Sequence, residues 1–207
     1  MTLGAGSQRD RIVEAMLACC AEKTYAATTI GDLVARAGVS RTTFYKHFDD
    51  KRACFDATLD LCLERLREVA AGSVSGADSP VEAVRRASAA LLEELAARPE
   101  LARLLSAEAI AVEPLAPLRY RDILVGALER LWRGRVPSGA ETDPGLASGR
   151  AQLLVFAVVA AGRPEQLPQL HPDVVYLALA PFTGHEEARR QSRLAAEDVH
   201  PGPLLRA

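Results

Sequence analysis

Hydrophobic positions recur at three- and four-residue steps along most of the 207-residue chain, which is the period of an amphipathic helix. Stretches in which apolar and polar residues alternate, the pattern of a half-buried strand, are hard to find. Ala, Leu, Arg and Glu dominate the composition, and all four favour helices. The sequence therefore predicts an all-α fold.

Three short helices are expected within the first fifty residues. Thr29 and Asp32 match a capping box, which opens the second helix, and Gly38 is placed to end it. Ser40 is then the expected N-cap of the third. The three helices are expected over residues 8–23, 29–37 and 41–48. Two short amphipathic helices around a tight Gly-Val-Ser turn are typical of a helix-turn-helix.

Further helices are expected to fill the rest of the chain. Asp49 and Asp50 interrupt the pattern before a long helix begins at Lys51, and Ser79-Pro80 is a strong start signal for the next one. The helices are expected over about residues 51–71, 80–98, 99–112, 118–133, 146–162, 173–182 and 185–198. Loops rich in Gly, Ser or Pro are expected over residues 72–78, 134–145 and 164–172.

The third helix carries an unusual polar face. Phe44 and Phe48 are expected in the core, whereas the other side chains can all donate hydrogen bonds and none is acidic. These donors are Arg41, Thr42, Thr43, Tyr45, Lys46 and His47. A donor-rich face without a carboxylate suits a polyanion. The alternative is an ordinary solvated face, but such a face more often includes Glu or Asp.

The segment from Thr28 to Lys51 resembles the DNA-binding segment of the tetracycline-repressor (TetR) family. The residues that match the family's motif are Thr29, Val34, Ala35, Ala37, Gly38, Val39, Ser40, Phe44, Tyr45, His47, Phe48 and Lys51. The match covers about a quarter of the chain, and the rest is similar to the family in length and helical layout. The resemblance implies an N-terminal three-helix DNA-binding domain (residues 1–52) and a C-terminal helical ligand-binding and dimerisation domain (residues 53–207).

The resemblance also implies how the first domain would contact double-stranded DNA. Base edges would be read by Arg41, Thr42 and Thr43, with Arg41 suited to a guanine. The residues expected at phosphates are Thr29, Ser40, Tyr45, His47 and Lys51. Lys46 is placed to reach either a phosphate or a base. Gly31 departs from relatives in which a longer side chain adds a base contact, so readout is expected to rest on the third helix.

A homodimer is expected because two short helices make a poor clamp alone. Two symmetric copies would double the contacts and would place their helix-turn-helix motifs about one DNA turn, ~34 Å, apart. Residues 152–161 and 174–182 are too apolar for helices with one wet face. They are either central core helices or, as the resemblance favours, an interface shared by two subunits. The candidate interface residues are Leu154, Val158, Tyr176 and Leu179.

The resemblance further implies a small-molecule effector held among the middle helices. Charged residues are sparse on the apolar faces of these helices, which favours an apolar or amphipathic ligand. The candidate lining residues are Leu91, Leu95, Glu108, Tyr120, Leu124, Trp132 and Gln152, although each also fits a purely structural role. A ligand that tilts the long helix beginning at Lys51 would move the helix-turn-helix motifs of the two subunits apart.

The charge distribution agrees with a DNA-binding front end. A net charge of −2 argues against a uniformly basic coat. Residues 1–52, however, hold eight Lys or Arg against six Asp or Glu, whereas the remainder holds seventeen against twenty-one. This asymmetry has the sign expected if the first domain meets phosphate.

The remaining features exclude other classes of protein. Cysteines 19, 20, 54 and 62 lack metal-binding spacing and are expected to be reduced core thiols, with a redox sensor as the alternative. The N-terminus is too polar for a signal peptide, and the longest apolar run, residues 153–161, is far shorter than the ~18 residues of a membrane span. A cytoplasmic protein without membrane contact is therefore expected.

An enzyme is not expected, and neither is a cofactor. The chain has no nucleophile elbow, zinc-binding His-Glu-x-x-His or phosphate loop, and His171, His185 and His200 are expected at the surface. Together with these exclusions, the resemblance implies a homodimeric repressor that binds a palindromic operator and is released by a small apolar or amphipathic ligand. The alternatives are a helix-turn-helix scaffold without an inducer response and a helical enzyme.

Overall fold

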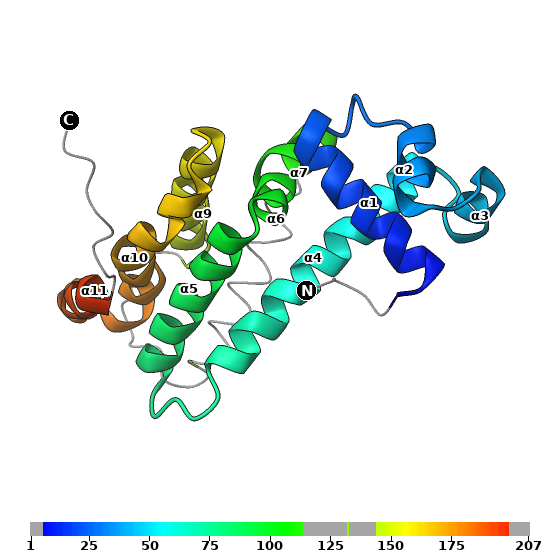
Figure 1. The fold of residues 1–207 in the computed structure, drawn as a ribbon. Helices are drawn as coiled ribbons and strands as arrows, with labels where there is room; N and C mark the ends of the chain where they lie inside the picture. Colours follow the sequence, from blue (N-terminus) through cyan, green and yellow to red (C-terminus); the bar gives the residue numbers. More distant parts are fainter. Residues whose placement is uncertain (1–5, 114–131, 133–143, 199–207) are drawn as a thin grey trace. The chain divides into compact units, whose positions relative to one another are not determined.

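The computed structural model describes residues 6–113, 132 and 144–198, and all regular structure in these ranges is helical (Figure 1). The chain divides into two compact units. The first combines Met1–Glu68 with Arg98–Pro117, and the second combines Val69–Ala97 with Leu118–Ala207. The predicted all-α fold is confirmed for the described residues, and each unit has its own core.

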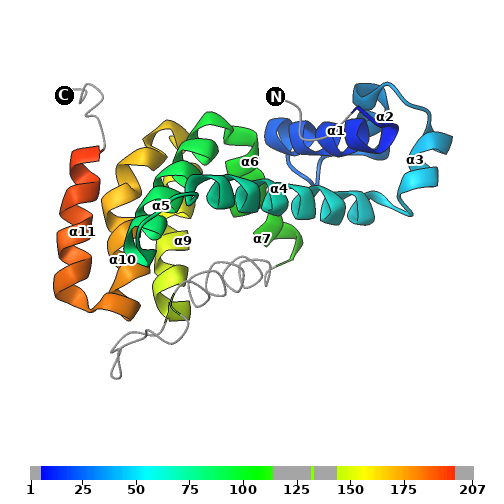
Figure 2. The same ribbon diagram turned by 90° about the horizontal axis from the view of Figure 1, so that it is seen from below.

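The first unit is built around α1, which contacts α2, α3, α6 and η1 (Figure 2). Its elements are α1 (Gln8–Lys23), α2 (Ile30–Ala37), α3 (Arg41–His47), α4 (Lys51–Ser73) as far as residue 68, α6 (Pro99–Arg103), the π-helical turn η1 (Leu104–Glu108) and α7 (Ala109–Val112). One face of α1 is buried at three- and four-residue steps, as the sequence predicts; it includes Ile12, Val13, Met16, Leu17 and Cys20.

Local capping explains where these helices begin and end. The Thr29 side chain accepts a hydrogen bond from the Asp32 N–H, and the Asp32 carboxylate accepts one from the Thr29 N–H, so the predicted capping box is present. Gly38 ends α2 in the left-handed conformation with φ 62°. The Asp50 carboxylate accepts a hydrogen bond from the Ala53 N–H at 2.7 Å, which fixes the start of α4. The sequence signals for these boundaries are confirmed.

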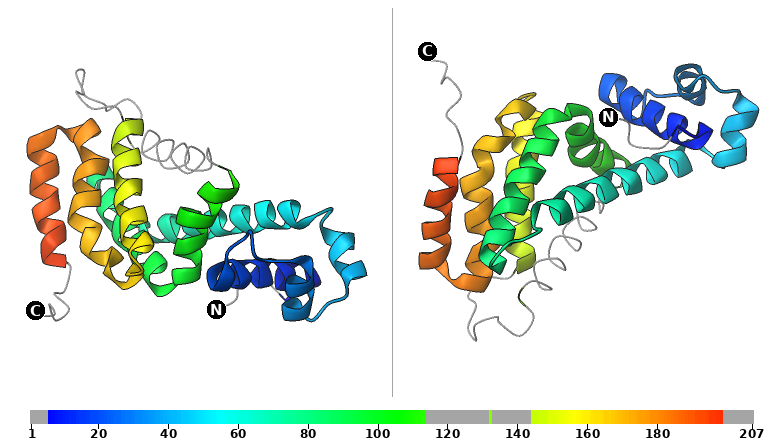
Figure 3. Two further views of the ribbon diagram at one scale, coloured as in Figure 1. Left: turned by 90° about the horizontal axis from the view of Figure 1, so that it is seen from above. Right: turned by 60° about the horizontal axis from the view of Figure 1, so that its bottom comes forward.

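The second unit centres on α10, which contacts α5, α9, η2 and α11 (Figure 3). Its elements are α5 (Pro80–Ala97), α9 (Pro144–Ala160), the 3-10 helix η2 (Pro164–Leu170), α10 (His171–Thr183) and α11 (His185–Asp198). Its core includes Val84, Val175, Leu179 and Trp132, and the Trp132 ring stacks on Phe182 with centroids 4.8 Å apart.

Three features of the fold differ from the sequence predictions. Residues 164–172, predicted as a loop, form η2 and the start of α10. His171, predicted at the surface, is 3% exposed, and its Nε2 lies 3.0 Å from the Arg85 carbonyl oxygen. The predicted single helix 99–112 contains a π turn, in which the Ala109 N–H donates to the Leu104 carbonyl five residues earlier. The helix predicted over 118–133 falls almost wholly outside the described residues.

The compact units also divide the chain elsewhere than at residue 52. The first unit takes in α4 as far as residue 68 and the segment from Arg98 to Pro117, and α6 and η1 of that segment contact α1. A functional boundary at 52/53 therefore stays a prediction. Within the described ranges, no helix is both long and apolar enough to cross a bilayer.

The four cysteines are unbridged and buried. Burial raises the pKa of the Cys20, Cys54 and Cys62 thiols to about 12. Because the thiolate is the reactive form, these three side chains are unreactive at neutral pH while the unit is folded. This supports the interpretation of core thiols over the redox-sensor alternative.

Candidate nucleic-acid interface

The short helix α3 is held by its two phenylalanines. Phe44 is fully buried and Phe48 is 5% exposed, with ring centroids 5.7 Å apart. Ser40 caps the helix, since its Oγ accepts a hydrogen bond from the Thr43 N–H at 3.0 Å. Arg9 lies over the Phe48 ring, 5.3 Å from its centroid. These contacts fix which face of α3 points into the core.

The opposite face of α3 is open to solvent and has no acidic side chain. Its exposed residues are Arg41, Thr42, Tyr45, Lys46 and His47, and Thr43 is partly exposed. Tyr45 is 53% exposed although it neighbours buried Phe44. The structure thus brings together on one surface six residues that the sequence predicted to contact DNA.

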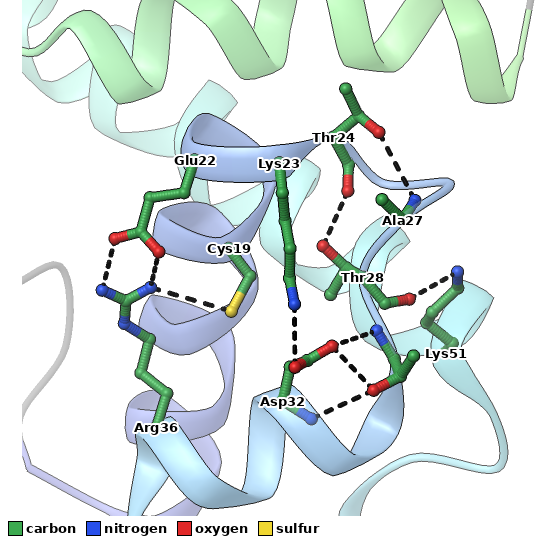
Figure 4. Close-up of polar contacts among 10 residues, drawn as sticks. Cys19, Glu22, Lys23, Thr24, Ala27, Thr28, Asp32, Arg36 and Lys51 are labelled. Atoms are coloured by element: carbon green, nitrogen blue, oxygen red, sulfur yellow. Dashed lines mark hydrogen bonds and ion pairs between the residues drawn. The ribbon is translucent and has the colours of Figure 1, made fainter.

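The start of α2 is a dense polar network (Figure 4). The Thr29 N–H and hydroxyl both donate to Asp32 Oδ2, at 2.8 and 2.7 Å. The Lys23 ammonium lies 2.8 Å from Asp32 Oδ1. Hydrogen bonds from Lys23 and then Thr29 hold the pKa of the Asp32 carboxyl well below its usual range. Both donors of Thr29 are thus engaged within the protein, and its predicted phosphate contact would have to compete with Asp32.

A second polar contact ties α2 to α1. The Arg36 guanidinium donates to both carboxylate oxygens of Glu22, at 2.5 and 2.7 Å, and to Cys19 Sγ at 3.8 Å (Figure 4). Such a two-pronged pair restricts orientation as well as distance. It therefore helps to set the angle at which α2, and α3 after it, leaves α1.

Lys51 has a role within the protein that the sequence did not reveal. Its Nζ donates to the carbonyl oxygens of Tyr25 and Thr28, both at 2.9 Å, and lies 4.1 Å from the Tyr25 ring centroid. An ammonium has three N–H donors, so one is left for another acceptor. The phosphate contact predicted for Lys51 stays a prediction, whereas its contact with the α1–α2 connection is part of the fold.

Gly31 lies at the start of α2, close to the Arg41 side chain of α3. A Cβ atom at this position would lie 3.4 Å from Thr29 Oγ1 and 3.5 Å from an Arg41 guanidinium nitrogen. The Arg41 side chain therefore reaches the first turn of α2. The expectation that base readout rests on α3 stays a prediction.

The candidate dimer residues fall into two groups. Leu179 is fully buried in the core of its own unit, so its prediction as an interface residue was wrong, because it has no surface to offer a partner. Leu154, Val158 and Tyr176 are partly exposed. Sequence reasoning missed Leu153, which is 65% exposed on α9.

The candidate ligand residues are also separated by the fold. Tyr120 and Leu124 lie outside the described residues. Leu95 is buried in α5, Trp132 belongs to the core of the second unit, and Leu91 and Gln152 are partly exposed. Glu108 belongs to the first unit instead, where its Oε2 accepts a hydrogen bond from the Tyr25 N–H at 2.7 Å. Stacking in the core and bonding to the backbone give Trp132 and Glu108 structural roles.

No metal site accompanies this surface in the part of the chain that the structure describes, where His, Cys, Asp and Glu side chains nowhere gather in a group of three that would hold an ion.

Comparisons with known proteins point to the same surface. Residues 12–58 match the family described as bacterial regulatory proteins, tetR family. Over 61 residues the chain is 25% identical to the biofilm operon icaADBC HTH-type negative transcriptional regulator IcaR of Staphylococcus aureus strain Newman. That segment is 30% of this chain and 33% of IcaR, so the chain spans about a third of the curated relatives it matches.

Solved structures extend the likeness of the fold over most of the chain. The fatty acid degradation regulator FadR from Bacillus halodurans superposes with a TM-score of 0.70 at 19% identity, covering 87% of this chain and 97% of FadR. A gamma-butyrolactone receptor described as ArpA-like gives a TM-score of 0.63 at 21% identity, covering 93% and 98%. At these identities the likeness concerns the fold.

Proposed function

We propose that this chain, whose residues 12–58 match the family described as bacterial regulatory proteins, tetR family, is a DNA-binding transcriptional repressor. Two copies bind a palindromic operator, with α3 of each in the major groove. A small apolar or amphipathic ligand releases them. The protein acts in the cytoplasm, where bacterial DNA lies.

The observation that carries the proposal is the split of α3 into two faces. Phe44 and Phe48 are buried, while the exposed residues 41–47 offer donors and cations without one carboxylate. Groove edges and phosphates are rich in acceptors, so such a face gains contacts on DNA and meets no repulsion. Arg41, which reaches the start of α2, is the best placed to read a guanine.

A homodimer is supported by the apolar surface of α9. Leu153 is 65% exposed, and Leu154 and Val158 are partly exposed beside it in the sequence. Exposed apolar side chains gathered on one helix are typical of interaction surfaces. A seven-residue reading helix also makes few contacts alone, and a two-fold partner doubles them.

The names of the relatives support repression and the class of ligand. IcaR is named as a negative regulator, FadR as a regulator of fatty acid degradation, and the ArpA-like protein as a receptor for gamma-butyrolactone. Fatty acids and butyrolactones are small and either apolar or amphipathic. The same chemical class fits the apolar faces of the middle helices, on which the sequence places few charged residues.

Selection of bound sequences from random DNA tests the proposal most directly. We expect a palindrome whose half-sites are centred about one helical turn apart, and a saturable complex whose affinity falls as salt rises. A helix-turn-helix scaffold or an enzyme predicts no such complex. Addition of fatty acids or lactones should then weaken binding by at least about fivefold for the true ligand class. Shifts below about twofold throughout would contradict the release step.

Arg41→Ala tests the orientation of α3. It should cost about 1–3 kcal/mol at one base position and relax the sequence preference there. Arg67→Ala is a matched control, because Arg67 is exposed on α4 and pairs with Glu64 at 2.8 Å, away from α3 in the sequence. If Arg41→Ala kept its preference in a repeated selection, α3 would be oriented differently from the proposal.

A further inference from the structure

One buried carboxylate joins two segments of the first unit that are far apart in the sequence. Glu108 Oε2 accepts a hydrogen bond from the Tyr25 N–H at 2.7 Å, across 83 positions. Glu108 is 5% exposed and ends the π turn η1. Tyr25 lies in the connection between α1 and α2. A charged acceptor at this distance makes a strong hydrogen bond.

The peptide units of Tyr25 are held by opposite charges. The Glu108 carboxylate accepts from its N–H, and the Lys51 ammonium donates to its carbonyl oxygen at 2.9 Å. Lys51 also donates to the Thr28 carbonyl oxygen, and Thr28 directly precedes the N-cap of α2. The Tyr25 ring packs edge-on against Phe55, with centroids 4.8 Å apart. Both charged groups therefore act on the few residues that aim α2.

The backbone beside Tyr25 needs such support. Thr24 has φ 79° and ψ 156°, a conformation that is costly for any residue with a side chain and more so for a β-branched one. A strained residue persists only where its surroundings impose it. The bonds to Glu108 and Lys51 hold the residue that follows directly, so they are placed to impose the turn.

The segment that carries Glu108 is itself anchored. Its other carboxylate oxygen lies 3.7 Å from Arg103 Nε. Farther along, the Arg52 guanidinium donates to the Val112 carbonyl oxygen at 3.3 Å and to the Glu113 carboxylate at 3.2 Å. Since α6 and η1 also contact α1, the Glu108 carboxylate is presented from a fixed support.

We infer that Glu108 is a positioning residue for DNA recognition: through the Tyr25 N–H it sets the α1–α2 turn, and so the orientation in which α2 and α3 meet the groove. The inference rests on the proposed function. It replaces the ligand-contacting role that the sequence suggested for Glu108. A bond that only added stability would lower the folded fraction and affect all DNA alike, whereas a positioning bond affects the matched operator more than random DNA.

The test uses the full chain and three substitutions of one residue. Glu108→Gln keeps an acceptor oxygen, Glu108→Ala removes it, and Glu108→Met removes it while filling the space. Glu64→Gln is the matched control, because Glu64 is an exposed acid of the same unit that pairs with Arg67 and takes no part in holding Tyr25 or the segment of Glu108. The first measurement, which needs no DNA, is the NMR chemical shift and exchange rate of the Tyr25 amide. The second is the affinity for the selected operator and for random-sequence DNA.

We expect Glu108→Ala and Glu108→Met to weaken operator binding by about tenfold, the size of one lost charge-assisted hydrogen bond. Binding to random DNA should change less than about threefold, because phosphate contacts do not depend on register. The Tyr25 amide should shift upfield and exchange faster. Glu108→Gln keeps an acceptor but loses the charge, so it should fall between the wild type and Glu108→Ala in the amide and operator measurements. Glu64→Gln should match the wild type.

The two arms separate failure of this inference from failure of the proposed function. An unchanged Tyr25 amide in Glu108→Met would overturn the contact itself. A changed amide with unchanged operator binding, or with equal losses on operator and random DNA, would overturn the positioning role. If Glu108→Ala does not fold, Glu108→Met and Glu108→Gln decide. A wild-type chain that selects no DNA would refute the proposed function and the positioning role together, while the amide arm would still show whether the contact exists.

Discussion

Helices α3 and α9 both lack acidic side chains, yet they differ in how their orientation is determined. In α3, two buried phenylalanines stand against a polar exposed face. In α9, apolar residues continue from Leu153 to Ala160 around the whole helix, so that Leu153 is 65% exposed. Contacts with α10 and η2, rather than its own pattern, decide which side of α9 is covered.

The difference follows from the free energy of turning each helix over. Rotation of α3 would expose Phe44 and Phe48, each worth about 1.5–3 kcal/mol of burial, and would bury cations in their place. Rotation of the second half of α9, residues 153–160, exchanges one apolar side chain for another. A helix with two unlike faces thus encodes its own orientation, whereas a uniformly apolar helix takes its orientation from its neighbours.

The largest effect is expected from Phe44→Ala, which tests the buried face of α3. Removing a fully buried ring should cost about 3–5 kcal/mol of unfolding free energy and abolish operator binding. Tyr45→Ala, at the exposed neighbouring position, should change stability by less than about 0.5 kcal/mol and weaken DNA binding without unfolding. Denaturant titration and gel shift measure the two effects. Equal destabilisation by both substitutions would contradict the assignment of faces.

On the α9–α10 side, Leu179 and Leu153 form the corresponding pair. Leu179→Ala should destabilise by about 2–5 kcal/mol, because Leu179 is fully buried. Leu153→Glu should leave the fold intact and, if α9 forms the dimer surface, yield a monomer by light scattering at the concentration where the wild type is a dimer. A Leu153→Glu dimer as tight as the wild type would move the interface away from this residue.

The loss of unfolding free energy at low pH should depend on Asp32. Because hydrogen bonds from Lys23 and Thr29 lower its folded-state pKa, the stabilisation is complete above the unfolded pKa of about 3.9 and is lost as pH falls toward the folded value. The unfolding free energy of the wild type should therefore decrease as pH falls below about 4. Asp32→Asn should make this decrease smaller. Lys23→Met, which removes the first donor, should also make it smaller. If neither variant changes the slope of unfolding free energy against pH, other carboxyl groups control acid unfolding.

The smallest effect is expected at two glycines and should have opposite signs. In Gly31→Ala, the new Cβ would lie in ordinary contact with Thr29 Oγ1 and an Arg41 nitrogen, at 3.4 and 3.5 Å. Because residue 31 lies in α2, where Ala is favoured over Gly, the unfolding free energy should rise by up to about 1 kcal/mol. Gly38→Ala forces a side chain into φ 62° and should destabilise by about 1 kcal/mol or more. Thermal unfolding with both variants measures the difference in Tm. Stabilisation by Gly38→Ala would contradict the left-handed cap.

Local signals predicted the elements that local chemistry controls. The predicted bounds of α1 and α11 agree with the structure. The predicted caps at Thr29, Gly38 and Ser40 are confirmed, and each depends on residues within three or four positions of the helix end. The start of α10 was missed. Its first residue, His171, is stabilised by the Arg85 carbonyl of another helix, and no neighbour in the sequence announces that partner.

Patterning alone determined that this chain is helical, that it has a helix-turn-helix near its start, and that α3 presents donors outward, since each follows from interactions between near neighbours. Tertiary structure decided that Leu179 is core, that Lys51 and Glu108 hold the Tyr25 backbone, and that a π turn precedes Ala109. The reason is distance along the chain: an ammonium 26 positions away and a carboxylate 83 positions away can be matched to one peptide only after packing has brought them there.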